Sequence, residues 1–343
     1  MGNCFNEVKM SKKILMIHTG GTLGMAEGKP DNSLKPVQFQ ESVVNFVPEL
    51  NQLADIETVF AFNIDSANLT IKHINKLVEV IKENYELYDG FVIIHGTDAM
   101  AYSGSALSFL IKNNKKPIIL TGSQKPLRHI RTDARLNLIN AVEFATMDIP
   151  EVAICFNSKL MRANRATKVS SGDFDAFDSP NFPYLATVGV EINLNNRCIM
   201  PISFGGEIEF NFLKEKNIVH IKTFPGLNPS IYRHFLNNDT DGIIVEAYAT
   251  GNIPILENSL IPFIIEANEL GIPVIITSQA KRGKINLDAY ECGRKAKEAG
   301  AISALDMTIE SAIMKFQYLL SKDYNVSEIK KLFLKNISGE ISE

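Results

Sequence analysis

The chain has 343 residues, 45% of them hydrophobic and 22% charged, and 35 basic against 39 acidic residues give a net charge of −4. At about 150 residues per domain, this length predicts one large or two ordinary domains. A slightly acidic chain lacks the basic excess of a nucleic-acid-binding protein, so no nucleic-acid partner is expected. No run reaches the roughly 18 apolar residues of a membrane span, so no membrane partner is expected either.

Residues 1–13 precede the first predicted strand and are interpreted as a short leader. They contain no apolar signal sequence, and Asn6 stands where an acylation signal prefers Ser or Thr. The four cysteines, at positions 4, 155, 198 and 292, form no Cys-x-x-Cys pair and have no histidine at metal-ligand spacing. We therefore expect reduced thiols, no metal site and a cytoplasmic protein.

Short runs rich in Ile and Val alternate with longer segments of helical spacing, the pattern of a parallel sheet covered by helices. The runs are continuously hydrophobic, which predicts strands buried on both faces. In the first half, the predicted strands are 14–18, 59–64, 91–95, 117–120 and 152–156, and the predicted helices are 69–88, 100–112 and 132–147. In the second half, the predicted strands are 218–223, 242–247 and 272–277, and the predicted helices are 229–236, 260–270, 290–299 and 307–320.

These elements predict an α/β fold of two domains. Residues 14–190 would form the larger N-terminal catalytic domain, with a flavodoxin-like parallel sheet. Residues 213–343 would form a smaller, Rossmann-like α/β domain. The segment between them, 191–212, lacks helical spacing and is rich in Asn, Pro and Gly, so it is predicted to be the linker, with some strand structure.

Polar residues follow four consecutive predicted strands, at the edge of an open parallel sheet where ligands bind. They are Thr19-Gly20-Gly21-Thr22, Asp65-Ser66, Gly96-Thr97-Asp98 and Thr121-Gly122-Ser123-Gln124. A phosphate-binding turn at Gly20 is the alternative, but the spacing matches neither the dinucleotide-binding fingerprint nor a P-loop. Taken alone, Thr22 or Thr97 would be expected to cap a helix.

Residues 19–25 and 90–100 resemble the two signature segments of bacterial-type L-asparaginases. Residues 121–124, 164–168 and 174–177 resemble the middle of that family, and residues 306–312 resemble the tail of its cytoplasmic, type I branch. The motifs occur in the family's order and cover nearly the whole chain. The resemblance implies hydrolysis of the side-chain amide of L-asparagine to L-aspartate and ammonia, with glutamine a poorer substrate and no metal or organic cofactor.

The resemblance also implies the catalytic residues. Thr22 is the expected nucleophile, which attacks the amide carbon to form an acyl-enzyme. Thr97, Lys168 and Asp98 are the expected second hydroxyl, base and orienting group, which activate water. Backbone amides of Gly21 or Thr22 and of Thr97 would hold the oxyanion.

The expected substrate-binding residues are Gly21, Asp65, Ser66, Gly96, Ser123, Asn252 and Tyr290. Asp65 and Asp98 would accept from the substrate ammonium, Ser66 would donate to its carboxylate, and the backbone around Ser123 would accept from the leaving amide. Asp65 fits a helix cap equally well, and Lys168 would otherwise be assigned to a solvated basic loop.

Asn252 and Tyr290 lie in the C-terminal half, where family members reach into the active site of a neighbouring subunit. This implies a homodimer or homotetramer whose pocket is completed in trans. The alternative is that Gly251-Asn252 merely turns the chain after a strand. His18 and His95 are expected to be core histidines, without a catalytic role.

The chain departs from the family in its lid. Most asparaginases carry a tyrosine a dozen or so residues after the nucleophile, but residues 25–68 contain none, and the first tyrosine is Tyr85. The group that activates Thr22 is therefore open. Two alternative functions share this sheet or these motifs: the asparaginase-like subunit of a tRNA-dependent amidotransferase, and a non-catalytic amino-acid sensor.

Some type I enzymes bind asparagine at a regulatory site that uses a cysteine after a Ser/Thr-Gln pair and an arginine in the preceding strand. This chain has Ala280 and Glu246 at the comparable positions. We therefore predict a hyperbolic dependence of the rate on asparagine concentration, measured by ammonia release. A sigmoidal curve would contradict the prediction.

Overall fold

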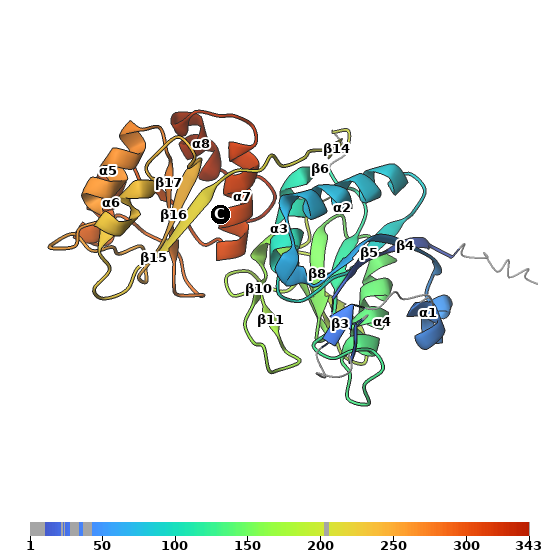
Figure 1. Ribbon diagram of the computed structural model, residues 1–343. Helices are drawn as coiled ribbons and strands as arrows, with labels where there is room; N and C mark the ends of the chain where they lie inside the picture. Colours follow the sequence, from blue (N-terminus) through green and yellow to red (C-terminus); the bar gives the residue numbers. More distant parts are fainter. Residues whose placement is uncertain are drawn as a thin grey trace, which may run out of the picture.

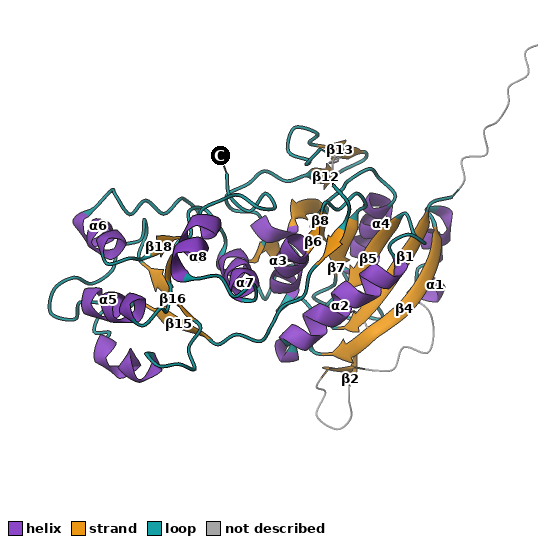
Figure 2. Ribbon diagram, turned by 90° about the horizontal axis from the view of Figure 1, so that it is seen from above, coloured by secondary structure: helices purple, strands orange, loops and turns teal. Residues whose placement is uncertain are grey.

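The computed structural model describes residues 11–21, 23, 25–27, 34–36, 43–201 and 206–342. Two separate sheets dominate them, a larger one from the first half of the chain and a smaller one from the second half (Figures 1 and 2). The predicted α/β class with a larger and a smaller parallel-sheet domain is confirmed. Residues 1–10 of the expected leader lie outside the described residues.

Among the described residues the larger sheet has eight strands, in the order β13-β12-β9-β8-β7-β5-β1-β4. Five of them, β4-β1-β5-β7-β8, are parallel and follow the flavodoxin-like order 2-1-3-4-5, so the order reverses between β1 and β5. The strands are β1 (Lys13–Gly20), β4 (Asp55–Ile64), β5 (Gly90–Ile94), β7 (Ile118–Thr121), β8 (Val152–Phe156), β9 (Lys159–Arg162), β12 (Ala186–Val188) and β13 (Ile192–Leu194).

Helices cover both faces of this sheet. On one face lie α2 (Ile71–Asn84) and α3 (Met100–Leu110), and on the other lie α4 (Ala134–Ala145), α1 (Val43–Phe46) and the 3-10 helix η2 (Pro48–Gln52). Successive residues of β1 enter different cores, because Leu15 packs with the cluster of α2 and α3 while Met16 packs with the cluster of α4. This explains why the central runs are continuously apolar.

The smaller sheet is parallel, with its strands in sequential order. They are β15 (Ile218–Lys222), β16 (Gly242–Ala247), β17 (Val274–Ser278) and β18 (Ile302–Ser303), and the helices around them are α5 (Ile261–Glu269), α6 (Glu291–Glu298), α7 (Ile309–Leu320) and α8 (Val326–Phe333). Short pairs complete the description: β2 (Met25–Glu27) with β3 (Leu34–Pro36), β6 (Ile111–Lys112) with β14 (Glu209–Phe210), and β10 (Thr167–Lys168) with β11 (Phe177–Asp178). The remaining 3-10 helices are η3 (Ser66–Asn68), η4 (Ala163–Arg165) and η5 (Pro229–Phe235).

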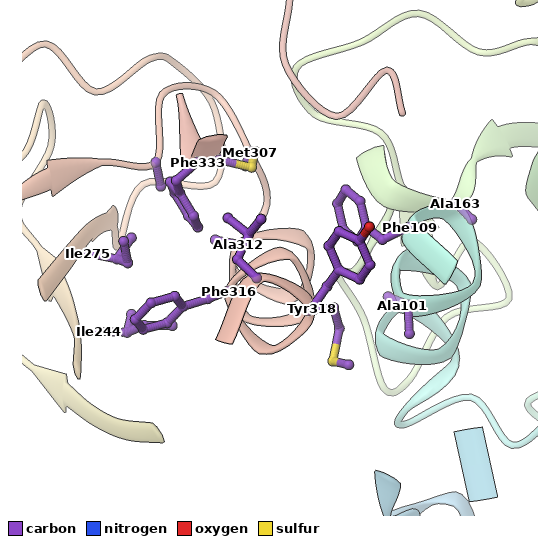
Figure 3. Packing of buried hydrophobic residues seen from close by; sticks show 14 of the residues in the cluster. Ala101, Phe109, Ala163, Ile244, Ile275, Met307, Ala312, Phe316, Tyr318 and Phe333 are labelled. Atoms are coloured by element: carbon purple, nitrogen blue, oxygen red, sulfur yellow. The ribbon is translucent and has the colours of Figure 1, made fainter. Parts of the chain in front are cut away.

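Helix α7 lies between the smaller sheet and α3 (Figure 3). Phe316 points toward Ile244 on β16, whereas Tyr318 points toward Phe109 on α3, where the two ring centroids are 6.4 Å apart. The buried side chains of both halves therefore form one continuous hydrophobic cluster. The packing of α7 thus sets the two sheets relative to each other.

The structure differs from the predicted elements in three ways. Strand β4 is an edge strand with largely alternating exposure, so it is not buried on both faces. The segment predicted as the helix 229–236 is the 3-10 helix η5, in which only Pro229 is buried, so no apolar face supports an α-helix. The antiparallel strands β9 and β12 and the helix α8 were not predicted, because their apolar patterns are too short, whereas β13 lies in the segment 191–212, where some strand structure was expected.

The C-terminal tail is anchored by a buried ion pair. The Lys315 ammonium, fully buried on α7, donates to Glu340 Oε1 at 2.5 Å and to the carbonyl oxygens of Phe333 and Lys335. Burial lowers the pKa of Lys315, and the charge of Glu340 opposes that shift. Glu340 also accepts hydrogen bonds from the backbone amides of Ile337 and Ser338.

Replacing Glu340 with alanine leaves the Lys315 ammonium buried without an anion. We expect Glu340→Ala to lower the free energy of unfolding by about 3–5 kcal/mol, measured by urea denaturation. The control is Glu266→Ala, which removes an exposed ion pair with Arg233 and should cost much less. Equal losses in the two variants would contradict the importance of the buried pair.

Candidate active site

Three strand ends meet at the point where the strand order reverses. Gly21, after β1, has a φ of +86°, and a Cβ atom there would lie 2.6 Å from the Gly96 backbone, after β5. A Cβ atom on Gly96 would lie 2.5 Å from Oγ of Ser66, after β4. A side chain at Gly21 would collide with the Gly96 backbone, and a side chain at Gly96 would collide with the Ser66 side chain, so glycine fits both positions. The expected residues Gly21, Ser66 and Gly96 are therefore in contact.

Three of the expected catalytic side chains form the core of the candidate site. Lys168 Nζ donates to Thr97 Oγ1 at 2.8 Å and to Asp98 Oδ1 at 2.6 Å. Thr97 is buried, the Lys168 side chain is 20% exposed and the Asp98 side chain is 63% exposed. A hydroxyl, an amine and a carboxylate thus meet at a partly buried place, open to solvent on the Asp98 side. We call these three residues the Thr97 cluster.

Two further residues support the Thr97 cluster, and the sequence analysis did not single out either role. The Thr97 hydroxyl donates to Gln124 Oε1 at 3.4 Å, and the Gln124 backbone amide donates to both carboxylate oxygens of Asp133 at 3.1 and 2.9 Å. Asp133 directly precedes α4, so it ties the loop after β7 to that helix. The sequence signal that could have indicated a role for Gln124 is its position directly after β7, among the polar residues at the strand ends.

His95 is a fully enclosed neighbour of the Thr97 cluster. Its Nδ1 lies 2.7 Å from the Gly96 carbonyl oxygen and its Nε2 lies 2.8 Å from Ser103 Oγ. We assign the neutral tautomer with the proton on Nδ1, because a carbonyl oxygen can only accept and a hydroxyl can donate. Burial lowers the pKa of His95 to about 4, in keeping with the predicted core role.

The other expected substrate residues of the first domain lie at the same edge but have local partners. Asp65 Oδ1 accepts from the Ala67 amide at 3.0 Å and caps η3, so its capping role is real. Its second oxygen has no hydrogen-bond partner among the described residues. The Ser123 hydroxyl donates to the Lys125 carbonyl at 2.6 Å, so that side chain is turned into its own loop.

Asn252 and Tyr290 are not brought to the Thr97 cluster within one chain. Asn252 exchanges backbone hydrogen bonds with Tyr248 across a turn that contains Gly251 at a φ of +103°. Tyr290, 57% exposed, precedes α6, which lies on the side of the smaller sheet remote from the larger sheet (Figures 1 and 2). The turn at Gly251 is therefore observed, and a role for either residue in catalysis requires a second copy of the chain.

Thr22, the expected nucleophile, lies outside the described residues. So does most of the expected lid, of which β2 and β3 are described as an antiparallel pair. The Gly21 amide donates to the Ile64 carbonyl at 3.2 Å, so of the two expected donors, Gly21 or Thr22, the Thr22 amide stays the prediction. The Thr97 amide donates to no acceptor within the described part of the chain, so it is the candidate oxyanion donor among the described residues.

A cavity of about 360 Å³ lies beside the site, lined by Ser66, Asp98, Tyr102 and Met314 among others. A second, of about 160 Å³, is lined by Glu246 and Ala280. In the described ranges, no three His, Cys, Asp or Glu side chains gather as a metal site would require. Every helix in those ranges is too short or too polar to span a bilayer.

Two family models match the chain. "Asparaginase, N-terminal" matches residues 13–200, and "Glutaminase/Asparaginase C-terminal domain" matches residues 217–333. The chain belongs to the asparaginase family. L-asparaginase 1 of Escherichia coli K12 is 36% identical over 336 residues, 96% of this chain and 98% of that protein.

Solved asparaginases share the whole fold. The thermostable L-asparaginase of Thermococcus kodakarensis has a TM-score of 0.89 at 35% identity, over 96% of this chain and 99% of that one. L-asparaginase I of Vibrio cholerae has a TM-score of 0.88 at 34% identity, over 97% and 100%. The chain is therefore an asparaginase-family hydrolase similar to type I members, as the motifs predicted.

The two buried histidines make stability depend on pH. Burial lowers the pKa of His18, as of His95, to about 4, below the ordinary value of 6.5. The unfolded chain therefore binds more protons between these values, and we expect stability to fall as pH is lowered from about 6.5 to about 4, by at most about 1.4 kcal/mol per pH unit for each histidine.

Urea denaturation of wild type and His95→Gln at several pH values in this range measures the effect. The variant should lose less stability on acidification, because one of the two buried imidazoles is gone. His234→Gln, at an exposed position on η5, is the control and should follow wild type. An equal pH dependence in His95→Gln would contradict the assignment.

Proposed function

We propose that this protein hydrolyses the side-chain amide of L-asparagine to L-aspartate and ammonia through a threonine acyl-enzyme, with glutamine a poorer substrate. The observation that carries the proposal is the contact of Lys168 Nζ with the Thr97 hydroxyl and the Asp98 carboxylate. An amine within hydrogen-bond distance of a buried hydroxyl can move a proton to and from it. The similarity to proteins named L-asparaginase supports the substrate.

In the first half of the reaction, the Thr22 hydroxyl would attack the amide carbon of asparagine. The carbon–nitrogen bond breaks, the amide nitrogen takes up the proton that the Thr22 hydroxyl loses and leaves as ammonia, and an ester joins the aspartyl group to Thr22. The Thr97 amide is a candidate donor to the oxyanion, because it has no other acceptor among the described residues. The base that takes the proton of Thr22 is unassigned, since the usual lid tyrosine is missing.

In the second half, water would attack the ester and release aspartate and the Thr22 hydroxyl. Thr97 and Lys168 would take the proton of that water and pass it to the Thr22 oxygen that leaves the ester. Asp98 holds the lysine at 2.6 Å and compensates its charge. Gln124, anchored by Asp133, would fix the orientation of the Thr97 hydroxyl.

The proposed substrate contacts come from residues at the ends of the strands. The second oxygen of Asp65 and the exposed Asp98 carboxylate would accept from the substrate ammonium, which would otherwise be buried without a counter-charge. Ser66, packed against Gly96, would donate to the α-carboxylate, and the backbone at Ser123 would accept from the leaving amide. Asn252 and Tyr290 would act from a neighbouring copy, so the proposal includes a homodimer or homotetramer in the cytoplasm.

The amidotransferase subunit stays the alternative, since it shares the hydrolytic motifs. The match over 98% and 100% of the lengths of two L-asparaginases favours the free amidohydrolase. Release of ammonia from asparagine by the chain alone, without tRNA, ATP or a partner, separates the two functions.

Ammonia release by wild type, Thr22→Val, Thr97→Val and Lys168→Met tests the mechanism, with asparagine and glutamine as substrates. We expect each substitution to lower kcat at least about 100-fold, because it removes a proton-transfer group or the nucleophile. Thr187→Val and Lys159→Met are the matched controls, since they lie on β12 and β9, which β7 and β8 separate from β5 in the sheet. Full turnover in Thr97→Val or Lys168→Met would contradict the proton-transfer role assigned to that residue.

A further inference from the structure

Lys168 does not belong to either main sheet. It lies on β10, a strand of two residues that pairs only with the equally short β11 within the described residues. Thr167 pairs with Asp178, and Lys168 pairs with Phe177. So short a ladder cannot by itself hold a side chain in place, because isolated two-stranded pairs are at best marginally stable. Other contacts must therefore fix the position of the lysine.

Three of those contacts come from the second half of the chain. Thr167 Oγ1 donates to Glu310 Oε1 on α7 at 2.7 Å, and Lys281 Nζ donates to the Lys168 carbonyl oxygen at 3.4 Å. Arg282 pairs with Asp178 on β11 at 3.1 Å. Both short strands are thus tied to the domain of the smaller sheet.

The geometry of an extended strand links Glu310 to the Lys168 amine. Neighbouring side chains of a strand point to opposite faces. When the Thr167 side chain is bonded to Glu310 on one face, the Lys168 side chain is directed to the other, where Thr97 and Asp98 lie. A small rotation of β10 would move the amine away from both partners.

Glu310 is a rigid and unusual anchor. It is the second residue of α7, which is packed on both flanks (Figure 3), and its side chain is nearly fully buried. Its second oxygen, Oε2, is buried and has no hydrogen-bond partner among the described residues. Burial raises the pKa of Glu310, and the hydrogen bond from Thr167 opposes that shift.

We propose that Glu310 is a positioning residue, which holds Thr167 and thereby directs the Lys168 amine at Thr97. The proposal deepens the function proposed above, on which it rests for the importance of the lysine. The second domain then contributes to catalysis within one chain without touching the substrate. A merely structural role for Glu310 would stabilise the domain contact and leave the lysine unaffected.

The test measures how readily the Lys168 amine is acetylated. Wild type, Glu310→Ala and Glu310→Gln are labelled with acetic anhydride at low reagent excess, and modification of Lys168 is followed by peptide mass spectrometry. Lys159 serves as an internal reference, because it is 22% exposed and paired with Asp175, much as Lys168 is 20% exposed and paired with Asp98. Gln317→Ala is the matched control, since it removes a buried hydrogen bond to Lys214 elsewhere on α7.

We expect Glu310→Ala to raise the labelling of Lys168 relative to Lys159 about fivefold, the factor that the loss of one hydrogen bond implies. Glu310→Gln should stay within about twofold of wild type, because the amide oxygen still accepts from Thr167. Unchanged labelling in folded Glu310→Ala, or an equal rise in Gln317→Ala, would overturn the proposal.

Kinetics with asparagine form the second arm. We expect Glu310→Ala to lower kcat about fivefold or more with little change in KM, and Glu310→Gln to restore most of it. If wild type releases no ammonia from asparagine, the proposed function fails. The labelling result still decides whether Glu310 directs Lys168.

Discussion

Helix α7 packs with one flank against the smaller sheet and with the other against α3 on the larger sheet. Phe316 and Tyr318 carry these two contacts, and the buried cluster is continuous across them. Protein interiors pack as densely as organic crystals, so such a helix cannot shift without opening gaps on one side or the other. The placement of every group that reaches from the second domain to the first depends on this packing.

The candidate site combines two sources of order. The first is the reversal of strand order between β1 and β5, where Gly21 and Gly96 allow the ends of three strands to approach closely. The second is the short β10, which lies off the sheets and is held from outside. The hydroxyl of Thr97 comes from the first source and the amine of Lys168 from the second. The contact between Thr97 and Lys168 therefore joins two parts of the structure that are held in place by different interactions.

Much of the fold could be predicted from the sequence, because central parallel strands are continuous apolar runs and their covering helices keep helical spacing. The antiparallel strands β9 and β12 could not, since runs of three or four residues carry little periodicity. The hairpin between β8 and β9 turns on Asn157 and Ser158, both at positive φ, and this pair is a weaker turn signal than Asn-Gly.

The site was predictable where it follows strand ends and unpredictable where it depends on distant contacts. Thr97 and Asp98 follow a strand, but Lys168 is about 70 residues further on and was assigned only through the family resemblance. Glu310 gave no signal, because nothing in the sequence indicates that it contacts Thr167. The sequence left Gly21 and Thr22 as alternative oxyanion donors, and only the structure reveals that the Gly21 amide is bonded to Ile64.

The C-terminal tail lies close to the segment that leads into β10. Arg165, three residues before Lys168, donates to the Glu340 carbonyl and to Ser342 Oγ, and Asn164 donates to the Ser338 carbonyl. Traction on the tail would therefore be transmitted through a buried guanidinium toward the candidate site. Purification tags and display fusions are better attached at the opposite terminus, and exopeptidase trimming during preparation would loosen the same connection.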